Sequence, residues 1–223
     1  MKRKINLVGT STLTVSLPSK WAKQHNLKRG DEVEVAETEQ ELRIGLKLNE
    51  EYKKADIKLE FGNDWYINQV IRNFYLAGFD EVKVRFDDGI ILTKIQSSLD
   101  LLLGFEIIEY GKGFCLIKNI SSGIESELDN ILRKVFLLNK TLFETAIQQM
   151  SICKISLEQI KNIKNNLQRF SNFYRRIITK NNKYNAFKNR EIYTIVSRLI
   201  MVSNNLYYAH KYLSTQKKVS HLK

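Results

Sequence analysis

The most constraining stretch of the sequence is residues 9–35, which read GTSTLTVSLPSKWAKQHNLKRGDEVEV. It predicts a strand that ends at Pro18, the single proline of the chain, then a short helix, a turn at Gly30-Asp31 and another strand. A unit of about 45 residues lies near the size at which oligomerisation has to complete the hydrophobic core. Because unpaired strand edges also need cover, we expect two copies of this segment to pair their strands.

Apolar residues that alternate along the chain mark the strands of this first unit. They are Ile5, Leu7, Leu13, Val15, Leu17, Val33, Val35, Leu42, Ile44 and Leu46. A turn at residues 9–11 separates the first two strands, and the helix is expected at residues 19–25 with Trp21 and Ala22 directed inward. The pattern predicts a small β-rich unit over residues 1–50.

Basic side chains dominate the start of the chain. The first thirty residues hold seven Lys or Arg, and the first acidic residue is Asp31. We expect double-stranded DNA as the partner, with its phosphates contacted by Lys2, Arg3, Lys4, Lys20, Lys23, Lys28 and Arg29. The alternative is a solvated basic surface on a unit that only dimerises. Two interpretations stay open for the hydroxyl groups of Ser11, Thr12 and Thr14. They could donate hydrogen bonds to DNA, or they could belong to ordinary strand residues.

The middle of the chain alternates between strand and helix patterns. After a linker at residues 51–55, a strand is expected at 57–61, a helix at Trp65–Ala77 capped by Gly78, and a strand at Val82–Phe86. A helix at Ile90–Leu103 that ends at Gly104, and two strands at Phe105–Tyr110 and Phe114–Lys118, complete the order β-α-β-α-β-β. This pattern predicts a small α/β domain over residues 55–120.

From residue 122 onward the apolar period is helical. Ser122 with Glu125 forms a capping box for a first helix, and Ser156 with Gln159 begins a second. Asn181-Asn182 separates the second helix from a third. The pattern predicts an antiparallel three-helix bundle over residues 122–215, so the fold class is α+β and multidomain.

The C-terminal third carries most of the net charge of +12. Residues 151–223 hold fifteen Lys or Arg and two acidic residues. Three interpretations stay open: a second nucleic-acid surface, a face that docks an acidic partner or an anionic membrane surface, and an ordinary solvated helix face. Most tyrosines among these charges fall at core spacing, which favours packing over base stacking.

The first unit resembles the SpoVT/AbrB swapped-hairpin family. The matching residues are Leu17-Pro18 at the helix entry, Leu27 with Gly30-Asp31 at the turn, and Val33 with Val35 in the next strand. The resemblance implies that two chains interleave their hairpins into one barrel, and that basic side chains on one face contact DNA. Members of the family also include antitoxins and cell-division regulators.

The whole layout resembles archaeal proteins that join an AbrB-like domain to a PhoU-like helical domain, with the segment Leu103-Gly104-Phe105-Glu106-Ile107 before the bundle. This implies a transcriptional regulator of phosphate uptake. PhoU-like helices usually carry acidic metal-binding clusters, but residues 198–202 read RLIMV here, and Glu158 is the one acid of the second helix. Because hard cations need several converging oxygen ligands, we predict no metal site.

Several classes of protein are disfavoured. The three histidines, His25, His210 and His221, are scattered, and the chain lacks a Gly-rich phosphate loop, so we expect no enzymatic activity and no cofactor. Cys115 and Cys153 are isolated and fit reduced thiols. No run of about 18 apolar residues is present, so we expect no membrane span. We expect a cytoplasmic location instead.

These observations predict a homodimeric, DNA-binding transcription regulator. The first alternative is a phosphate-transport signalling adaptor that uses the barrel only to dimerise, with a protein partner on the bundle. The second is an antitoxin-like protein. DNA binding by the first unit would separate the regulator from the adaptor.

Overall fold

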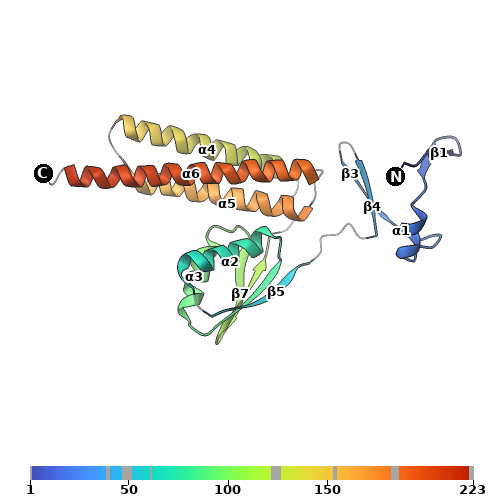
Figure 1. The fold of residues 1–223 in the computed structure, drawn as a ribbon, viewed down its shortest axis with the longest axis horizontal. Coiled ribbons are helices and arrows are strands. Elements are labelled where there is room, and N and C mark those ends of the chain that lie inside the picture. Colours follow the sequence, from blue (N-terminus) through green and yellow to red (C-terminus); the bar gives the residue numbers. More distant parts are fainter. Residues whose placement is uncertain are drawn as a thin grey trace. The chain divides into compact units, whose positions relative to one another are not determined.

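The computed structural model describes residues 2–38, 41–46, 52–60, 62–121, 127–152, 155–181 and 186–220. The chain divides into two compact units, Met1–Asn49 and Glu50–Lys223. Figure 1 shows the first unit in blue and the second from cyan to red. Each unit is described by itself.

The described part of the first unit contains four short strands and one short helix. β1 (Ile5–Val8) pairs antiparallel with β2 (Thr12–Val15), and β3 (Glu34–Thr38) pairs antiparallel with β4 (Glu41–Gly45). The helix α1 (Ser19–Gln24) follows Pro18 as predicted. The described part of one chain thus forms two separate two-stranded sheets and no closed barrel. Isolated hairpins of this kind are at best marginally stable in water.

The second unit begins with a mixed four-stranded sheet and two helices. The elements are β5 (Lys54–Leu59), α2 (Asp64–Leu76), β6 (Glu81–Phe86), α3 (Ile90–Leu99), β7 (Phe105–Gly111) and β8 (Phe114–Asn119). The strand order is β5-β6-β8-β7, with β5 parallel to β6 and the other pairs antiparallel. The predicted order β-α-β-α-β-β is confirmed.

Two boundaries in this sheet layer differ from the sequence prediction by three residues or more. Residues 54 and 55 belong to β5, so the predicted linker is wrong at these two positions. The reason is that Asp80 holds Lys53, the residue just before the strand. The Asp80 amide donates to Lys53 O at 2.8 Å, and the Asp80 carboxylate accepts from Lys53 N at 3.0 Å. The helix α3 ends at Leu99 rather than Leu103. Beyond it, Tyr75 Oη donates to Leu103 O at 2.7 Å, which holds that carbonyl outside the helix.

Three long helices complete the second unit. They are α4 (Leu128–Ser151), α5 (Leu157–Asn181) and α6 (Ala186–Ser220), and they lie side by side in Figure 1, each in contact with the other two. Ser156 caps α5 as predicted, since its hydroxyl accepts from Gln159 N at 3.4 Å. The capping box expected at Ser122 lies outside the described residues. The prediction of three helices is confirmed.

The sheet layer and the helices share one hydrophobic core. Ile71 and Val84 from the sheet layer are buried in the same cluster as Leu128, Tyr174 and Val196 from the three helices. A second buried cluster lies between the helices alone and contains Val135, Leu142, Ala146, Ile160 and Leu167. The described parts of the sheet layer and of the three helices, which the sequence predicts as separate domains, therefore pack as parts of one unit.

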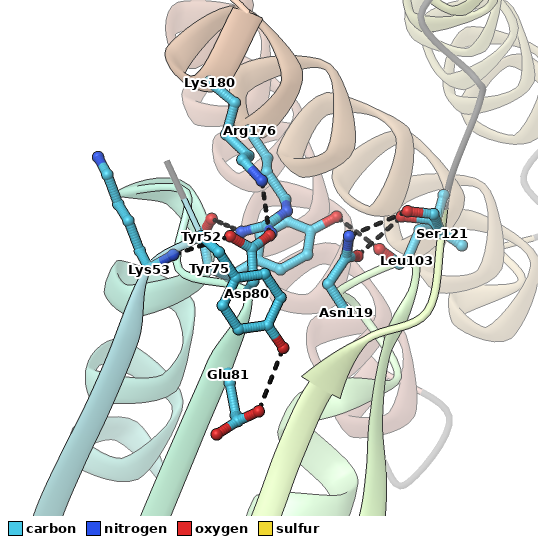
Figure 2. Close-up of polar contacts among 10 residues, drawn as sticks. All are labelled: Tyr52, Lys53, Tyr75, Asp80, Glu81, Leu103, Asn119, Ser121, Arg176 and Lys180. Carbon is cyan, nitrogen blue, oxygen red and sulfur yellow. Dashed lines mark hydrogen bonds and ion pairs between the residues drawn. The ribbon is translucent and has the colours of Figure 1, made fainter. Parts of the chain in front are cut away.

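A buried ion network joins the sheet layer to α5 (Figure 2). Asp80 Oδ1 accepts from Arg176 Nη2 at 3.1 Å and from Lys180 Nζ at 2.6 Å, and Arg176 Nη1 donates to Tyr75 O at 2.7 Å. The side chains of Arg176 and Asp80 are 2% and 6% exposed. Buried charges are tolerated when they are paired and hydrogen-bonded, so this network fixes where α5 sits on the sheet layer.

Candidate nucleic-acid interface

The seven predicted DNA-contacting side chains are all exposed and lie in two stretches of the sequence, residues 2–4 and residues 20–29. Residues 2–4 directly precede β1, Lys20 and Lys23 lie on α1, and Lys28 and Arg29 lie in the turn that follows. No ion pair joins any of the seven to another residue in the described part of the chain. Their charges are therefore available to an external polyanion.

The helix α1 positions two of these cations on one face. Lys20 and Lys23 are three residues apart, a spacing that places side chains next to each other on a helix. The helix is held at its start by Ala22 N, which donates to Pro18 O at 2.9 Å, and at its end by Leu27 N, which donates to Ala22 O at 2.9 Å. Trp21 and Ala22 are half-buried, in agreement with their predicted inward direction.

The turn after α1 keeps the first acidic residue away from the neighbouring cations. The Asp31 carboxylate accepts from the backbone Lys28 N at 2.7 Å, and Asp31 N donates to Lys28 O at 3.2 Å. Gly30 lies between them at φ +95°, in the left-handed region that favours glycine. Because Asp31 binds the backbone, the side chains of Lys28 and Arg29 remain exposed without a carboxylate partner.

The first hairpin carries an uncovered apolar face. Its register pairs Ile5 with Val15 and Leu7 with Leu13, and alternate residues of a strand point to the same side. These four side chains are between 47% and 69% exposed. The second hairpin repeats the arrangement: Val35 is 58% exposed and is paired with Ile44.

No side chain of the first unit is buried among those that the structure describes. Contiguous exposed apolar patches are typical of interaction surfaces. The sequence shows the alternation of apolar residues, but the opposition of Leu7 to Leu13 depends on the hairpin register and was not predicted.

The three hydroxyl side chains considered as DNA donors differ in their contacts. The hydroxyl of Thr14 donates to Asn6 O at 3.3 Å, so it stabilises the hairpin, whereas Ser11 and Thr12 are exposed.

Neither a metal centre nor a membrane span is found in the described residues. No group of three or more His, Cys, Asp or Glu side chains within them is placed to hold a metal ion. None of the helices described here has both the length and the apolar character needed to cross a membrane.

Comparison with known proteins agrees with the geometry of the first unit. Residues 7–54 match the family described as antidote-toxin recognition MazE, bacterial antitoxin. This match supports an AbrB/SpoVT-like swapped-hairpin domain at the N-terminus, which fits a DNA-binding or antitoxin-like role. The curated proteins and the solved structures gave no match. The matched residues end where β5 begins, so the match gives no support to the PhoU-like resemblance of the helices.

Proposed function

We propose that the protein is a homodimeric, DNA-binding transcription regulator in which two copies of residues 1–50 interleave into one β-barrel. The observation that carries this proposal is the first unit itself: its two hairpins expose apolar faces at Leu7 and Val35, and no described side chain in it is buried. A second copy supplies cover for these faces and partners for the strand edges.

The proposed dimer binds DNA mainly through charge. It brings together two sets of the seven cations, none of which is neutralised by a described carboxylate. Lysine and arginine that neutralise phosphates release counterions, so affinity falls steeply with salt concentration. A two-fold dimer also favours a palindromic DNA site. In this proposal the second unit receives the signal or the partner protein. Its assignment to phosphate uptake has no support beyond the resemblance of the helices.

The proposal is tested by titrating labelled double-stranded DNA with the full-length protein at several salt concentrations. Lys4→Ala combined with Lys20→Ala should weaken binding to every sequence and reduce the salt slope by about 0.9 for each phosphate that is no longer neutralised. The matched control is Lys112→Ala combined with Lys211→Ala, two exposed lysines of the second unit, and it should leave the slope unchanged. If the wild-type protein is a dimer that binds no DNA, the adaptor function replaces the regulator.

The second candidate is an antitoxin-like role, favoured by the description of the matching family. It is tested by co-expressing the full-length protein with the products of neighbouring genes that arrest growth. Relief of growth arrest by the wild-type protein, retained in the Lys4→Ala, Lys20→Ala variant, supports neutralisation of a toxin independently of DNA binding. Absence of relief with every neighbouring product rules this role out for those partners.

A further inference from the structure

Two arginines and a tyrosine lie on three helices of the second unit, in which α5 packs against both α2 and α6. Arg72 lies on α2, Arg175 on α5 and Tyr193 on α6. Arg175 Nη2 donates to Tyr193 Oη at 3.1 Å, and the Arg175 guanidinium lies 4.7 Å from the centre of the tyrosine ring. Arg72 donates to Gln69 Oε1 within its own helix. All three side chains are half-buried.

Neither arginine of this cluster has a counter-ion among the described residues. No ion pair joins Arg72 or Arg175 to any residue that the structure describes, and the Nε atoms of both are buried without a hydrogen-bond partner there. Burial lowers the pKa of Arg72, and the positive charge of Arg175 lowers it further. Two like charges in a partly desolvated place repel each other, and an unpaired buried charge is costly.

The neighbouring buried ion network differs from this cluster because its cations are paired with a carboxylate. Arg176 and Lys180 share the single carboxylate Asp80, at 3.1 and 2.6 Å (Figure 2). Asp80 thus neutralises Arg176 and Lys180 on α5. No carboxylate among the described residues pairs with Arg72 or Arg175 in the same way. The cluster therefore has the composition of an anion site rather than of a structural ion pair.

We propose that Arg72, Arg175 and Tyr193 form a binding site for the oxyanion group of a small molecule, either a carboxylate or a phosphoryl group. The guanidinium group presents its donors as a planar fork that matches both kinds of oxyanion. Tyr193 Oη accepts from Arg175, so its own hydrogen is directed elsewhere and serves as a third donor. The site is independent of DNA binding by the first unit.

A bound oxyanion would connect the sheet layer to two helices of the bundle. It neutralises the repulsion between α2 and α5 and adds a contact to α6. A ligand that binds only the folded state stabilises it by RT ln(1 + [L]/Kd). The expected consequence is an increase in the melting temperature of the second unit that continues with the logarithm of the ligand concentration above Kd.

The test uses the full-length protein in a chloride buffer, with sodium phosphate, sodium sulfate or sodium succinate added at constant ionic strength. We expect the melting temperature to rise with the logarithm of the anion concentration above Kd, and the titration heat to saturate with the same Kd. Arg72→Gln should weaken the affinity about tenfold or more, because it removes a charge-assisted contact. Tyr193→Phe, which keeps the ring under Arg175, should weaken it severalfold. The matched control is Arg133→Gln on α4, an exposed arginine, which should bind as the wild type does.

The anions also separate the two chemical sources. A response to phosphate and sulfate alone assigns a phosphoryl group, and a response to succinate assigns a carboxylate. Without added oxyanion, Arg72→Gln should melt at or above the wild-type temperature, because it relieves the repulsion. A lower melting temperature there, or an equal response of Arg72→Gln and wild type to every anion, overturns the proposal.

Discussion

The two units of this chain reach stability in different ways. Every described side chain of the first unit is exposed or half-buried, including Ile5 and Leu13 at 69% and 68% exposure. The second unit buries Ile67, Val84 and Phe105 completely or almost completely in one core shared by its sheet and helices. Because hydrophobic burial is the main favourable term in folding, the second unit has a core that can stabilise it, whereas the described part of the first unit buries no side chain.

The two units also use charge differently. In the second unit the Asp80 carboxylate is buried and satisfied by Arg176 and Lys180, so charge there holds the structure together. In the first unit the seven cations lie on the surface without carboxylate partners among the described residues, so charge there is available to a ligand. Arg72 and Arg175 of the second unit likewise have no carboxylate partner among the described residues.

The largest expected effect is loss of the dimer when the apolar hairpin face is made polar. Leu7→Ser combined with Leu13→Ser changes two residues that face each other across β1 and β2. Without apolar surface to bury, the first units should no longer associate, and sedimentation should show a monomer. The helical circular dichroism signal of the second unit should be unchanged.

The matched control for the dimer is an equally exposed leucine in the second unit. Leu137 on α4 is 56% exposed, against 62% for Leu7. Leu137→Ser should sediment as the wild type does. A dimer that persists in the Leu7, Leu13 variant would place the dimer contact elsewhere and remove the main argument for an interleaved barrel.

The next largest effect is expected at the buried ion network. Asp80→Asn leaves Arg176 buried without its counter-ion, which should lower the free energy of unfolding of the second unit by about 3–5 kcal/mol. The two tryptophans report the units separately, since Trp21 lies on α1 and Trp65 on α2. Urea unfolding followed by Trp65 fluorescence, in a Trp21→Phe background, should show the loss.

Two controls sharpen this result. Trp21 fluorescence in a Trp65→Phe background should show an unchanged midpoint, because Asp80 belongs to the second unit. Asp56→Asn removes the carboxylate that accepts from Arg85 at 2.6 and 2.9 Å, but this pair is exposed and should contribute little. Equal losses at Asp80 and Asp56 would show that burial does not set the strength of these ion pairs.

A smaller effect is expected at Gly78, which ends α2 beside the ion network. Its φ is +82°, and a Cβ built there lies 2.8 Å from Lys180 Cγ. Gly78→Ala should therefore lower the free energy of unfolding of the second unit by about 1–2 kcal/mol, measured by urea unfolding. Gly89→Ala is the control, because Gly89 has ordinary helical angles and open space around it. Equal effects at both positions would contradict this interpretation of the backbone.

The sequence predicted most of the elements because local signals define them. Pro18 before α1, Gly78 after α2 and the helical period of the last hundred residues each act over a few residues. The exposure of the seven cations was also predictable, since charged side chains rarely lie unpaired in a core. The predictions failed at the linker and at the end of α3, where hydrogen bonds from Asp80 and Tyr75 to distant segments decide the boundary.

Contacts between residues far apart in sequence could not be predicted from local patterns. Asp80 and Arg176 are separated by 96 positions, and Arg175 appeared in the sequence only as one of several basic residues on its helix. Its proximity to Arg72 follows from the packing of α2 on α5, which no periodicity encodes. The apolar faces of the hairpins likewise depend on register. The proposed pairing of two chains was expected from the sequence, whereas the proposed anion site follows only from contacts in the structure.

The last effect, which is expected only above pH 9, tests how well the core of the second unit excludes water. Burial raises the pKa of Cys115 from 9.0 to about 11. Below pH 9 the thiol is neutral in both the folded and the unfolded state. Between pH 9 and 11 the unfolded thiol ionises first, so unfolding releases a proton and stability falls as pH rises.

The measurement compares the free energies of unfolding of the wild type and of Cys115→Ala. Every other titrating group is present in both proteins, so its contribution cancels in the difference. At pH 8 the wild type should be the more stable, since the substitution leaves a cavity at a fully buried position. That advantage should shrink between pH 9 and pH 11 in urea unfolding experiments. A constant stability difference over this range would mean that Cys115 ionises as easily in the folded core as in the unfolded chain. That result would remove this support for the contrast between a second unit with a buried core and a first unit without one.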